Sequence, residues 1–337
     1  MPETVPEPNA DDTVVLDAAV LDGVVAEGAV LDGAAPEGAA ADKGAPERAA
    51  LDKGAQWRDD PQTITRLRAD PRTGVLVVRE RRVPLDDGLI LLSAGDPVLA
   101  RTREWALLGR RADGSGLLLA LQDPEDDTDA DGSWAPRWSD LRDALPVVDE
   151  VDAELVVSAI ALAGWLHDAG FCPACGSAAE LRQSGWSRHC PSCGREHFPR
   201  TDPAVIVAVQ SADGERLLLG ANAQWKGRFY SCFAGFVEAG ESLETTVHRE
   251  LFEEAGVRVR DVEYFSSQPW PFPRSLMVGF HATAVDEEGV QGDGEEIIDV
   301  RWLTRAEVGS ALEGNGPVGL PGAASIAHRL IVDWLRR

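Results

Sequence analysis

The chain has 337 residues, and its 57 acidic against 32 basic residues give a formal net charge of −25 at pH 7. This length allows two folded domains and a tail. The acidic balance disfavours a protein that holds nucleic acid mainly through the phosphate backbone, because Lys and Arg supply that attraction. It does not exclude a phosphate substrate that a metal ion bridges.

The sequence lacks the features of a membrane or exported protein. Its longest uncharged apolar run, Leu155 to Leu166, is too short to cross a bilayer, and its first residues show no basic segment followed by an apolar one. Of five cysteines, four form two Cys-x-x-Cys pairs, which in a reducing compartment favours metal binding over disulfides. We therefore expect a cytoplasmic protein with no membrane partner.

Residues 1–55 consist mainly of Ala, Gly, Asp, Glu and Val and repeat with a period of ten residues. Ala-Val-Leu-Asp-Gly occurs at both 19 and 29, and an aspartate recurs at every tenth position from Asp12 to Asp52. A solenoid is the structured interpretation of such a period, but each unit has too few large apolar side chains to bury a core. We therefore expect residues 1–55 to form a disordered acidic tail without a catalytic part.

From residue 56 to 150 the composition becomes that of a globular domain. Turn sequences such as Asp87-Gly88 separate short apolar runs, which predict strands at 75–78, 89–92, 105–108 and 117–121. The acidic stretch 124–132 is interpreted as a solvated loop, since its spacing does not fit a calcium-binding EF-hand loop. We expect a small, mainly β domain over residues 56–150.

A helix and a cysteine motif are expected over residues 151–200. The pattern from Asp152 to Ala169 predicts a helix, and two knuckles follow it, Cys172-Pro-Ala-Cys175-Gly and Cys190-Pro-Ser-Cys193-Gly. Paired knuckles of this kind bring four thiolates around one Zn²⁺. An unmetallated thiol cluster is the alternative, and a catalytic zinc is disfavoured because four cysteines leave no open coordination position. We therefore expect one structural zinc per chain.

The stretch from Gly235 to Val257 has the most regular spacing in the chain. Ser242 is a suitable N-cap and Gly256 a suitable helix stop, and the positions between them carry an apolar stripe of Val247, Leu251 and Ala255. The stretch therefore predicts a loop, a helix and a second loop. Before it, residues 204–209 and 216–220 predict buried strands, and Cys232 is expected to be a buried thiol.

The same helix carries Glu250, Glu253 and Glu254 at positions i, i+3 and i+4, so their carboxylates share one face beside the apolar stripe. Such like charges repel one another unless a divalent cation lies among them, and carboxylate oxygens suit Mg²⁺ or Mn²⁺. Arg249 can hold one carboxylate through two hydrogen bonds. An exposed acidic helix is the alternative, but it does not explain why glycines, an arginine and glutamates recur at fixed intervals.

After the helix, residues 266–277 read Ser-Ser-Gln-Pro-Trp-Pro-Phe-Pro-Arg-Ser-Leu-Met. Three prolines that alternate with polar and aromatic residues predict a stiff, extended loop presenting aromatic faces and a base. Such a loop suits a heteroaromatic ring next to a phosphate. A rigid connector with a core tryptophan is an equally good interpretation of the residues alone.

The stretch from Gly235 to Val257 matches the signature of the Nudix hydrolases, and the order of zinc ribbon, signature and Ser-Gln-Pro-Trp-Pro-Phe-Pro resembles the NADH pyrophosphatase subfamily. The resemblance covers roughly residues 141–337. It implies an α+β protein in which a Nudix α/β/α sandwich over residues 201–337 follows a four-cysteine zinc ribbon and the small, mainly β N-terminal domain. It also implies metal-dependent hydrolysis of NADH or NAD to AMP and nicotinamide mononucleotide, removal of NAD caps from RNA, and a homodimer.

The resemblance also implies roles for individual residues. The catalytic candidates are Arg249, Glu250, Glu253 and Glu254, with Glu253 as a ligand or as a base acting through water. The implied ligands of Mg²⁺ or Mn²⁺ are the carbonyl of Ala234 and the side chains of Glu250, Glu254 and Glu296, for which Glu295 is the alternative. The implied substrate contacts are Arg142, Phe198, Phe236, Gln268, Pro269, Trp270, Pro271, Phe272, Pro273, Arg274, Ser275 and Ala327.

Two positions depart from the pattern of the subfamily. Phe198 stands where tyrosine is common, and Gly185 stands where a substrate-contacting glutamate can occur, so the preference among NADH, NAD and NAD-capped RNA stays open. One alternative function is a broader Nudix pyrophosphatase for ADP-ribose and other dinucleotides. Another, from a different class, is a nucleic-acid-binding zinc-ribbon protein, against which the intact signature and the acidic balance argue.

Overall fold

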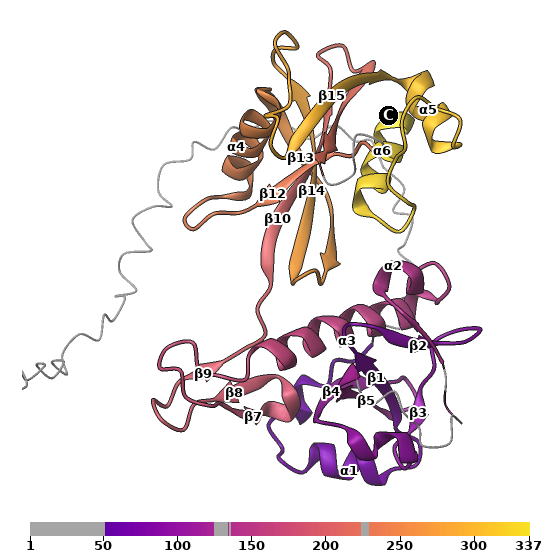
Figure 1. The fold of residues 1–337 in the computed structure, drawn as a ribbon, viewed down its shortest axis with the longest axis vertical. Helices are drawn as coiled ribbons and strands as arrows, with labels where there is room; N and C mark the ends of the chain where they lie inside the picture. Colours follow the sequence, from indigo (N-terminus) through magenta and orange to yellow (C-terminus); the bar gives the residue numbers. More distant parts are fainter. Residues whose placement is uncertain (1–50, 125–133, 135, 224–228) are drawn as a thin grey trace, which may run out of the picture. The chain divides into compact units, whose positions relative to one another are not determined.

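The computed structural model describes residues 51–124, 134, 136–223 and 229–337 (Figure 1). The repeats at 1–50 and nearly all of the acidic stretch at 124–132 lie outside these residues, and so do the expectations made for them. Leu51 is only 7% exposed and belongs to an apolar cluster of the N-terminal part. The packed part of the chain therefore includes residues before the expected boundary at 55.

A four-stranded sheet with the order β3-β1-β5-β4 forms the N-terminal part. β1 and β5 are parallel, and β3 and β4 pair antiparallel at the two edges. A second, two-stranded sheet pairs β2 with β6. The elements are η2 (Ala55–Trp57), α1 (Thr63–Ala69), β1 (Gly74–Arg79), β2 (Val83–Leu85), β3 (Leu92–Ser93), η3 (Pro97–Arg101), β4 (Glu104–Arg110), β5 (Gly116–Gln122), β6 (Arg137–Ser139), α2 (Leu141–Ala144) and α3 (Glu150–Asp168).

Three of the four strands expected in this part are confirmed as β1, β4 and β5, but the strand expected at 89–92 is wrong for all but Leu92. The residues before Leu92 instead close a local turn, in which Leu89 bridges back to Leu85 and Ile90 donates its amide to the Pro84 carbonyl at 3.0 Å. The residues before Leu92 therefore bond to β2 in a local turn and form no strand of the four-stranded sheet.

Both faces of the four-stranded sheet are buried. Along β1, Leu76 and Val78 belong to the cluster that contains the buried face of α3, whereas Val75 and Val77 belong to the cluster on the opposite face. This alternation follows from the two-residue period of a strand. α3 confirms the helix predicted from Asp152 to Ala169 and packs on the N-terminal sheet, although the expected division placed it with the zinc ribbon.

The zinc ribbon is a small three-stranded sheet that docks on β4. It contains β7 (Glu180–Arg182), η5 (Gln183–Gly185), β8 (Ser187–His189) and β9 (Glu196–His197). Trp186 donates its indole N–H to the Leu107 carbonyl at 2.6 Å. Gly185 has a φ of +94° and lies so close to Ala106 that any side chain there would collide with it. The glycine at this departure from the subfamily pattern is thus required by packing.

A six-stranded sheet forms the C-terminal part. Its main path runs β13-β14-β10-β11-β15, and β12 pairs with β10. β10 lies parallel to β14 and antiparallel to β11 and β12. The elements are β10 (Asp202–Gln210), β11 (Arg216–Asn222), β12 (Phe233–Phe236), α4 (Leu243–Ala255), β13 (Val259–Trp270), β14 (Ser275–Ala284), β15 (Ile297–Thr304), α5 (Arg305–Leu312) and α6 (Ile326–Arg336).

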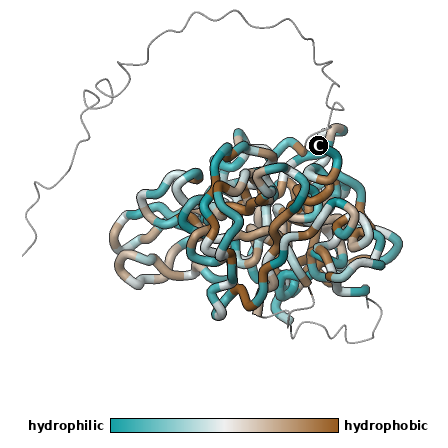
Figure 2. The backbone as a smooth tube through the Cα atoms, turned by 90° about the horizontal axis from the view of Figure 1, so that it is seen from above, coloured by the Kyte–Doolittle hydropathy of each residue, from teal (hydrophilic) through white to brown (hydrophobic). Residues whose placement is uncertain are grey.

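Helices cover both faces of this sheet, which confirms the expected α/β/α sandwich. In β10, Val205 and Val207 pack in the cluster that contains the apolar stripe of α4, whereas Ile206 and Ala208 pack with the buried residues of α5 and α6. Figure 2 shows hydrophobic and hydrophilic stretches alternating along the backbone, with many hydrophilic residues at its outer bends. Among the described residues, no helix is both long and apolar enough to cross a membrane.

The proline-rich stretch differs from the expected loop. β13 continues through Gln268 to Trp270, and β14 begins at Ser275, so only residues 271–274 form a turn between two paired strands. Pro269 fits in a strand because it lies in β13, an edge strand of the sheet. The expected extended loop is therefore the end of a β-hairpin, which projects from the sheet in Figure 1.

We predict that replacing Arg188 destabilises the docking of the ribbon. The Arg188 side chain is 5% exposed, and its Nη2 donates to both carboxylate oxygens of Glu104, at 2.7 and 2.8 Å, and to the Leu166 carbonyl at 3.0 Å. Arg188→Ala leaves the partly buried Glu104 carboxylate and the Leu166 carbonyl without this donor, which costs about 2 kcal/mol. Urea unfolding measures this loss.

Arg182→Ala is the matched control, because Arg182 pairs with Glu180 on the exposed surface. This variant should change the unfolding free energy by less than about 1 kcal/mol. Equal losses in the two variants would contradict the structural role assigned to Arg188.

Candidate active site

α4 forms as the sequence predicts, and a loop precedes it, although Gly235 and Phe236 at the start of the expected loop belong to β12. Ser242 caps the helix, its Oγ accepting the Thr245 amide at 3.1 Å, and Gly256 ends it with a φ of +64°. The apolar stripe is fully buried against the sheet. Since the stripe fixes the rotation of the helix, the direction of its acidic face is fixed as well.

Arg249 connects the loop, the helix and three carboxylates. Its guanidinium makes a two-pronged hydrogen bond to Glu241, at 2.7 and 2.8 Å, and donates to the Phe236 carbonyl at 2.9 Å. Nη1 lies 2.9 Å from Glu250 and 3.1 Å from Glu253. The hydrogen bonds from Arg249 lower the pKa of Glu241 to about 2. The expectation that Arg249 holds a carboxylate is confirmed, and the partner held by both prongs is Glu241.

Gly235 is required by the approach of Glu250. A side chain at this position would overlap the Glu250 carboxylate. Gly235 lies in β12 directly opposite Val205 of β10, so the strand cannot move away without losing its pairing. Its neighbour Ala234 is half-buried in the same strand. The backbone of β12 is thus held beside Glu250.

Glu254 is the most unusual side chain of the acidic face. It is 5% exposed, and its Oε2 has no hydrogen-bond partner among the described residues. Burial raises its pKa to about 8, and the negative charges of Glu296, Glu250 and others add to the shift. Glu253, in contrast, is 58% exposed and contacts Arg249. The three glutamates predicted on one face therefore lie in different environments.

Of the two adjacent glutamates Glu295 and Glu296, the electrostatics favour Glu296 as the one that acts on the acidic face of α4. The charge of Glu296 contributes to the raised pKa of both Glu254 and Glu250. Its Oε1 accepts a long hydrogen bond of 3.4 Å from the Asn222 side chain. A hollow at this place is lined by Asn222, Ala223, Glu295 and Glu296.

Asp293 is a residue of this site that the motif did not reveal. Its Oδ1 accepts three successive backbone amides, those of Glu295, Glu296 and Ile297, at 2.9 to 3.0 Å. Its own amide donates to the Glu254 carbonyl at 3.2 Å, and its charge helps to raise the pKa of Glu254. An aspartate before a glycine signals a turn in the sequence, but only the fold brings this turn to α4.

The acidic face has the donors that a divalent cation requires. Glu254 offers an unpartnered buried oxygen, and burial also raises the pKa of Glu250, so both carboxylates gain from a nearby positive charge. Hard oxygen donors of this kind suit Mg²⁺ or Mn²⁺. Among the described residues, only the four ribbon cysteines form a group of three or more potential ligands whose donor atoms all lie within 4.8 Å. The glutamates are therefore spread more widely than one closed ligand shell.

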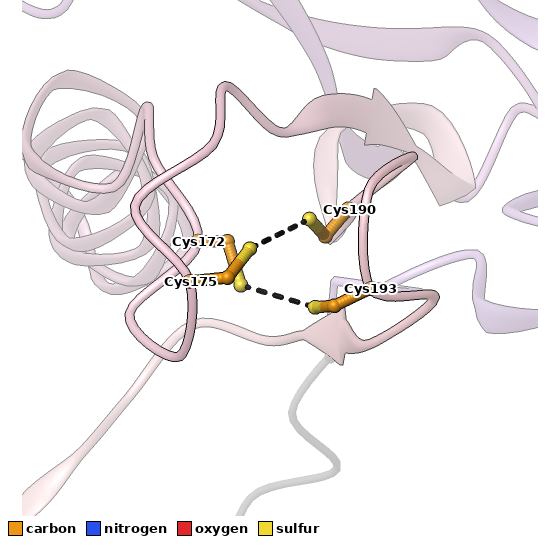
Figure 3. Close-up of side chains that lie close together, drawn as sticks. All are labelled: Cys172, Cys175, Cys190 and Cys193. Carbon is orange, nitrogen blue, oxygen red and sulfur yellow. Dashed lines mark hydrogen bonds between the residues drawn. The ribbon is translucent and has the colours of Figure 1, made fainter. Parts of the chain in front are cut away.

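The four ribbon cysteines converge as predicted (Figure 3). Sγ of Cys172 lies 3.6 Å from Sγ of Cys193, and Sγ of Cys175 lies 3.5 Å from Sγ of Cys190. Four sulfurs at about 2.3 Å from a tetrahedral Zn²⁺ would lie about 3.8 Å apart. The spacing therefore fits one zinc ion, and a fifth cysteine, Cys232, is buried in the C-terminal part as expected.

The two knuckles have the same backbone geometry. Gly176 and Gly194 have φ values of +73° and +75°, and each donates its amide at 2.9 Å to the carbonyl of the first cysteine of its knuckle. Such turns need glycine because other residues rarely adopt positive φ. The glycine after the second cysteine of each pair is therefore part of the zinc-binding geometry.

The residues expected to contact substrate differ in how exposed their side chains are in the structure. Phe198 and Phe236 are 55% and 51% exposed, so their rings are available to a ligand. Ala327 is buried in the cluster beneath α6. Arg142 lies over the Trp270 ring, with its Cζ 5.3 Å from the ring centroid.

The hairpin residues also make specific contacts within the protein. Gln268 donates to the Ala324 carbonyl at 2.7 Å and accepts the Ile326 amide at 2.6 Å, so its amide group fixes the start of α6. Arg274 pairs with Asp202 at 2.7 Å. Trp270 and Phe272 contact each other edge to face and pack against the apolar cluster that contains β1 and α3. The remaining predicted members, Pro269, Pro271, Pro273 and Ser275, complete the two strand ends and the turn.

Comparison with known proteins defines the class of this site. Residues 200–320 match the model of the NUDIX domain, and residues 167–198 match the NADH pyrophosphatase zinc ribbon domain. The chain is 40% identical over 283 residues to proteins named NAD-capped RNA hydrolase NudC from Mycobacterium bovis (strain BCG / Pasteur 1173P2) and Mycobacterium tuberculosis (strain ATCC 25618 / H37Rv), which covers 80% of this chain and 85% of each relative. It is 39% identical over 203 residues to human NAD-capped RNA hydrolase NUDT12, covering 57% of this chain and 44% of that protein.

The chain thus combines a Nudix domain with the zinc ribbon of NADH pyrophosphatases. It belongs to the NudC family of Nudix hydrolases.

We predict that Glu254 makes the metal-free protein less stable as the pH rises. The unfolded carboxyl ionises near its ordinary value of 4.5, but the folded one keeps its proton up to about pH 8. The folded state therefore binds more protons in this window, and its stability falls by up to about 1.4 kcal/mol per pH unit. Urea unfolding between pH 5 and 8, with zinc in the ribbon and no other divalent ion, measures the slope.

Glu254→Gln is the control, because it keeps the shape of the side chain and cannot ionise. Its unfolding free energy should lack this slope, and Mg²⁺ should reduce the slope of the unaltered protein by binding the ionised carboxylate. The same pH dependence in both proteins would contradict the assignment of the slope to Glu254.

Proposed function

We propose that the chain hydrolyses the pyrophosphate bond of NADH and NAD, giving AMP and nicotinamide mononucleotide, and that it removes NAD caps from RNA. The observation that carries the proposal is the buried carboxylate of Glu254, whose Oε2 has no hydrogen-bond partner among the described residues and which lies near the charges of Glu250 and Glu296. Burying this carboxylate costs folding free energy, which suggests that it serves to bind a positively charged group. The family membership and the names of the NudC relatives support the choice of substrates.

In this proposal, Glu250, Glu254, Glu296 and the Ala234 carbonyl hold Mg²⁺ or Mn²⁺. When bound, these ions neutralise pyrophosphate charge and lower the pKa of a bound water. Arg249 keeps Glu250 and Glu253 in place, and its bonds to Glu241 and the Phe236 carbonyl tie the catalytic loop to α4. The geometry around the acidic face is thereby fixed before substrate arrives.

We assign the orientation of the attacking water to Glu253. Its carboxylate is exposed at the edge of the acidic face and held by Arg249 at 3.1 Å, whereas Glu254 is enclosed and suited to be a ligand. The water attacks phosphorus in line with the bridging oxygen, whose bond to phosphorus breaks. The exposed rings of Phe198 and Phe236 are proposed to contact the nucleotide, with the hairpin end gripping the nicotinamide half.

The proposal also covers the role of zinc, the oligomeric state and the cellular location. Zinc is assigned a structural role because four thiolates leave no open coordination position. A homodimer, which the family resemblance implies, and a cytoplasmic location, which the sequence features indicate, are part of the proposal.

A rate assay on NADH, NAD, ADP-ribose and an NAD-capped RNA, with Mg²⁺ or Mn²⁺ and products identified by mass, tests this function. We expect AMP and nicotinamide mononucleotide from NADH and NAD, and Glu254→Gln should reduce the rate by about 10³-fold, because it removes several kcal/mol of transition-state stabilisation. Glu244→Gln is the matched control, as Glu244 is exposed on the same helix. An inactive unaltered protein, or full activity in Glu254→Gln, would refute the proposal.

A second variant separates this function from a broad pyrophosphatase. If Trp270 stacks on the nicotinamide, Trp270→Ala should lower kcat/KM for NADH by about tenfold or more, because stacking a base on an aromatic ring contributes about 1–3 kcal/mol. Hydrolysis of ADP-ribose, which lacks the ring, should change by less than about threefold. Trp270→Phe should retain most of the preference for NADH over ADP-ribose. Equal losses on both substrates in Trp270→Ala would favour the broader dinucleotide pyrophosphatase.

A further inference from the structure

The turn between β1 and β2 has an unusual composition. Arg79 and Arg82 exchange two backbone hydrogen bonds, of 3.1 and 2.8 Å, so Glu80 and Arg81 are the two residues of a tight hairpin turn. Both have positive φ, 47° and 64°. Turns with two such residues prefer Asn-Gly, because larger side chains are strained in this conformation. The strain suggests that one of the two side chains has a role outside the turn.

Glu80 is exposed, but Arg81 is half-buried and makes three hydrogen bonds to distant residues. Its Nη1 donates to the carbonyls of Pro271 and Pro273, both at 3.2 Å. Its Nη2 donates to Asp168, the last residue of α3, at 3.3 Å. The guanidinium therefore bridges α3 and the turn of the β13–β14 hairpin.

The surface of α3 is shaped for this guanidinium. Gly164 lies one helical turn before Asp168, and a Cβ there would come within 3.3 to 3.5 Å of Nη2, Cζ and Nε of Arg81. The absence of a side chain at Gly164 therefore leaves room for the guanidinium against the helix. Asp168 then holds the planar group by its edge.

The hairpin turn has few bonds of its own. Pro271 and Pro273 have no amide hydrogen, and the Phe272 amide donates to the Trp270 carbonyl at 2.8 Å. The two carbonyls that Arg81 binds flank Phe272 on both sides. Trp270 is held in addition by Arg142 of α2 and by contacts with the apolar cluster around β1. Elements of the N-terminal part thus determine where both aromatic rings lie.

We propose that Arg81 is a positioning residue for substrate selection: by binding the carbonyls of Pro271 and Pro273 it holds Trp270 and Phe272 where the nicotinamide half of the substrate binds. The inference rests on the proposed function, since it concerns the same reaction. It assigns the N-terminal sheet a part in specificity, with no contact between Arg81 and the reacting atoms.

The test replaces Arg81 with glycine. Arg81→Gly removes the three hydrogen bonds but installs the residue that this turn position prefers, so the thermal midpoint should not fall. In the substrate-free protein, hydrogen exchange of the amides from 268 to 275 should become about tenfold faster, because opening of the hairpin end is no longer resisted. The ratio of kcat/KM for NADH to that for ADP-ribose should fall by about tenfold, as the aromatic rings lose their fixed position.

Two further variants separate the effect of the Arg81 hydrogen bonds from the effect of the turn conformation. Glu80→Asn relaxes the neighbouring strained position and leaves Arg81 intact, so exchange and substrate ratio should stay unchanged. Arg81→Lys keeps the charge but cannot bind two carbonyls and a carboxylate from one planar group, so it should resemble Arg81→Gly.

Unchanged hydrogen exchange from 268 to 275 in both Arg81 variants would overturn the inference, whatever the activity. Faster exchange with an unchanged substrate ratio would overturn the role in selection. If the unaltered protein fails to hydrolyse NADH, the proposed function fails, but the exchange experiment still decides whether Arg81 holds the hairpin.

Discussion

The hydrogen bonds of Arg249 are the interaction on which the acidic site depends. One guanidinium ties Glu241 and the Phe236 carbonyl of the preceding loop to α4, and it also contacts Glu250 and Glu253. Without it, the loop would carry negative charge next to a negatively charged helix face, and the two would repel each other. Arg249 thereby compensates the charges of Glu250 and Glu253 on the helix face, whereas Oε2 of Glu254 has no hydrogen-bond partner among the described residues.

The burial of Glu254 is a consequence of helix geometry. Its neighbour Ala255 and the residue Leu251, one turn earlier, are fully buried in the core of the sandwich. Any residue at 254 must therefore lie at the edge of that core. The apolar contacts of the stripe stabilise the helix position and offset the cost of enclosing a carboxylate. The packing of α4 on the sheet therefore also sets the position of Glu254, the proposed metal ligand.

The two parts of the described chain contribute differently to the site. α4 and the strands beside it supply the charged groups, whereas the aromatic end of the β13–β14 hairpin is held by Arg81 and Arg142, which lie far away in the sequence. The zinc ribbon docks on β4 of the N-terminal sheet through Arg188 and Trp186. Under the proposed role of Arg81, mutations in the N-terminal part alter substrate preference without changing the acidic face.

Local signals in the sequence determined the elements that carry the chemistry. Caps, an apolar stripe and carboxylates at helical spacing were sufficient to predict α4 and its acidic face, because each acts over one or two helical turns. The two cysteine knuckles were also predictable from the sequence, since each is closed by hydrogen bonds between near neighbours. The layered fold was predicted differently, because the α/β/α sandwich was implied by the resemblance to Nudix hydrolases.

Other features depended on residues that only the tertiary structure brings together. The different environments of Glu253 and Glu254, the part played by Asp293 and the packing of Gly185 on Ala106 arise from contacts between distant segments. The stretch at 266–277 looked like a loop because its prolines lack amide donors, yet an edge strand tolerates them. The sequence by itself determined which groups are candidates for the chemistry; the tertiary structure decided which of them are buried, paired or left without a partner, because burial depends on contacts made across the whole fold.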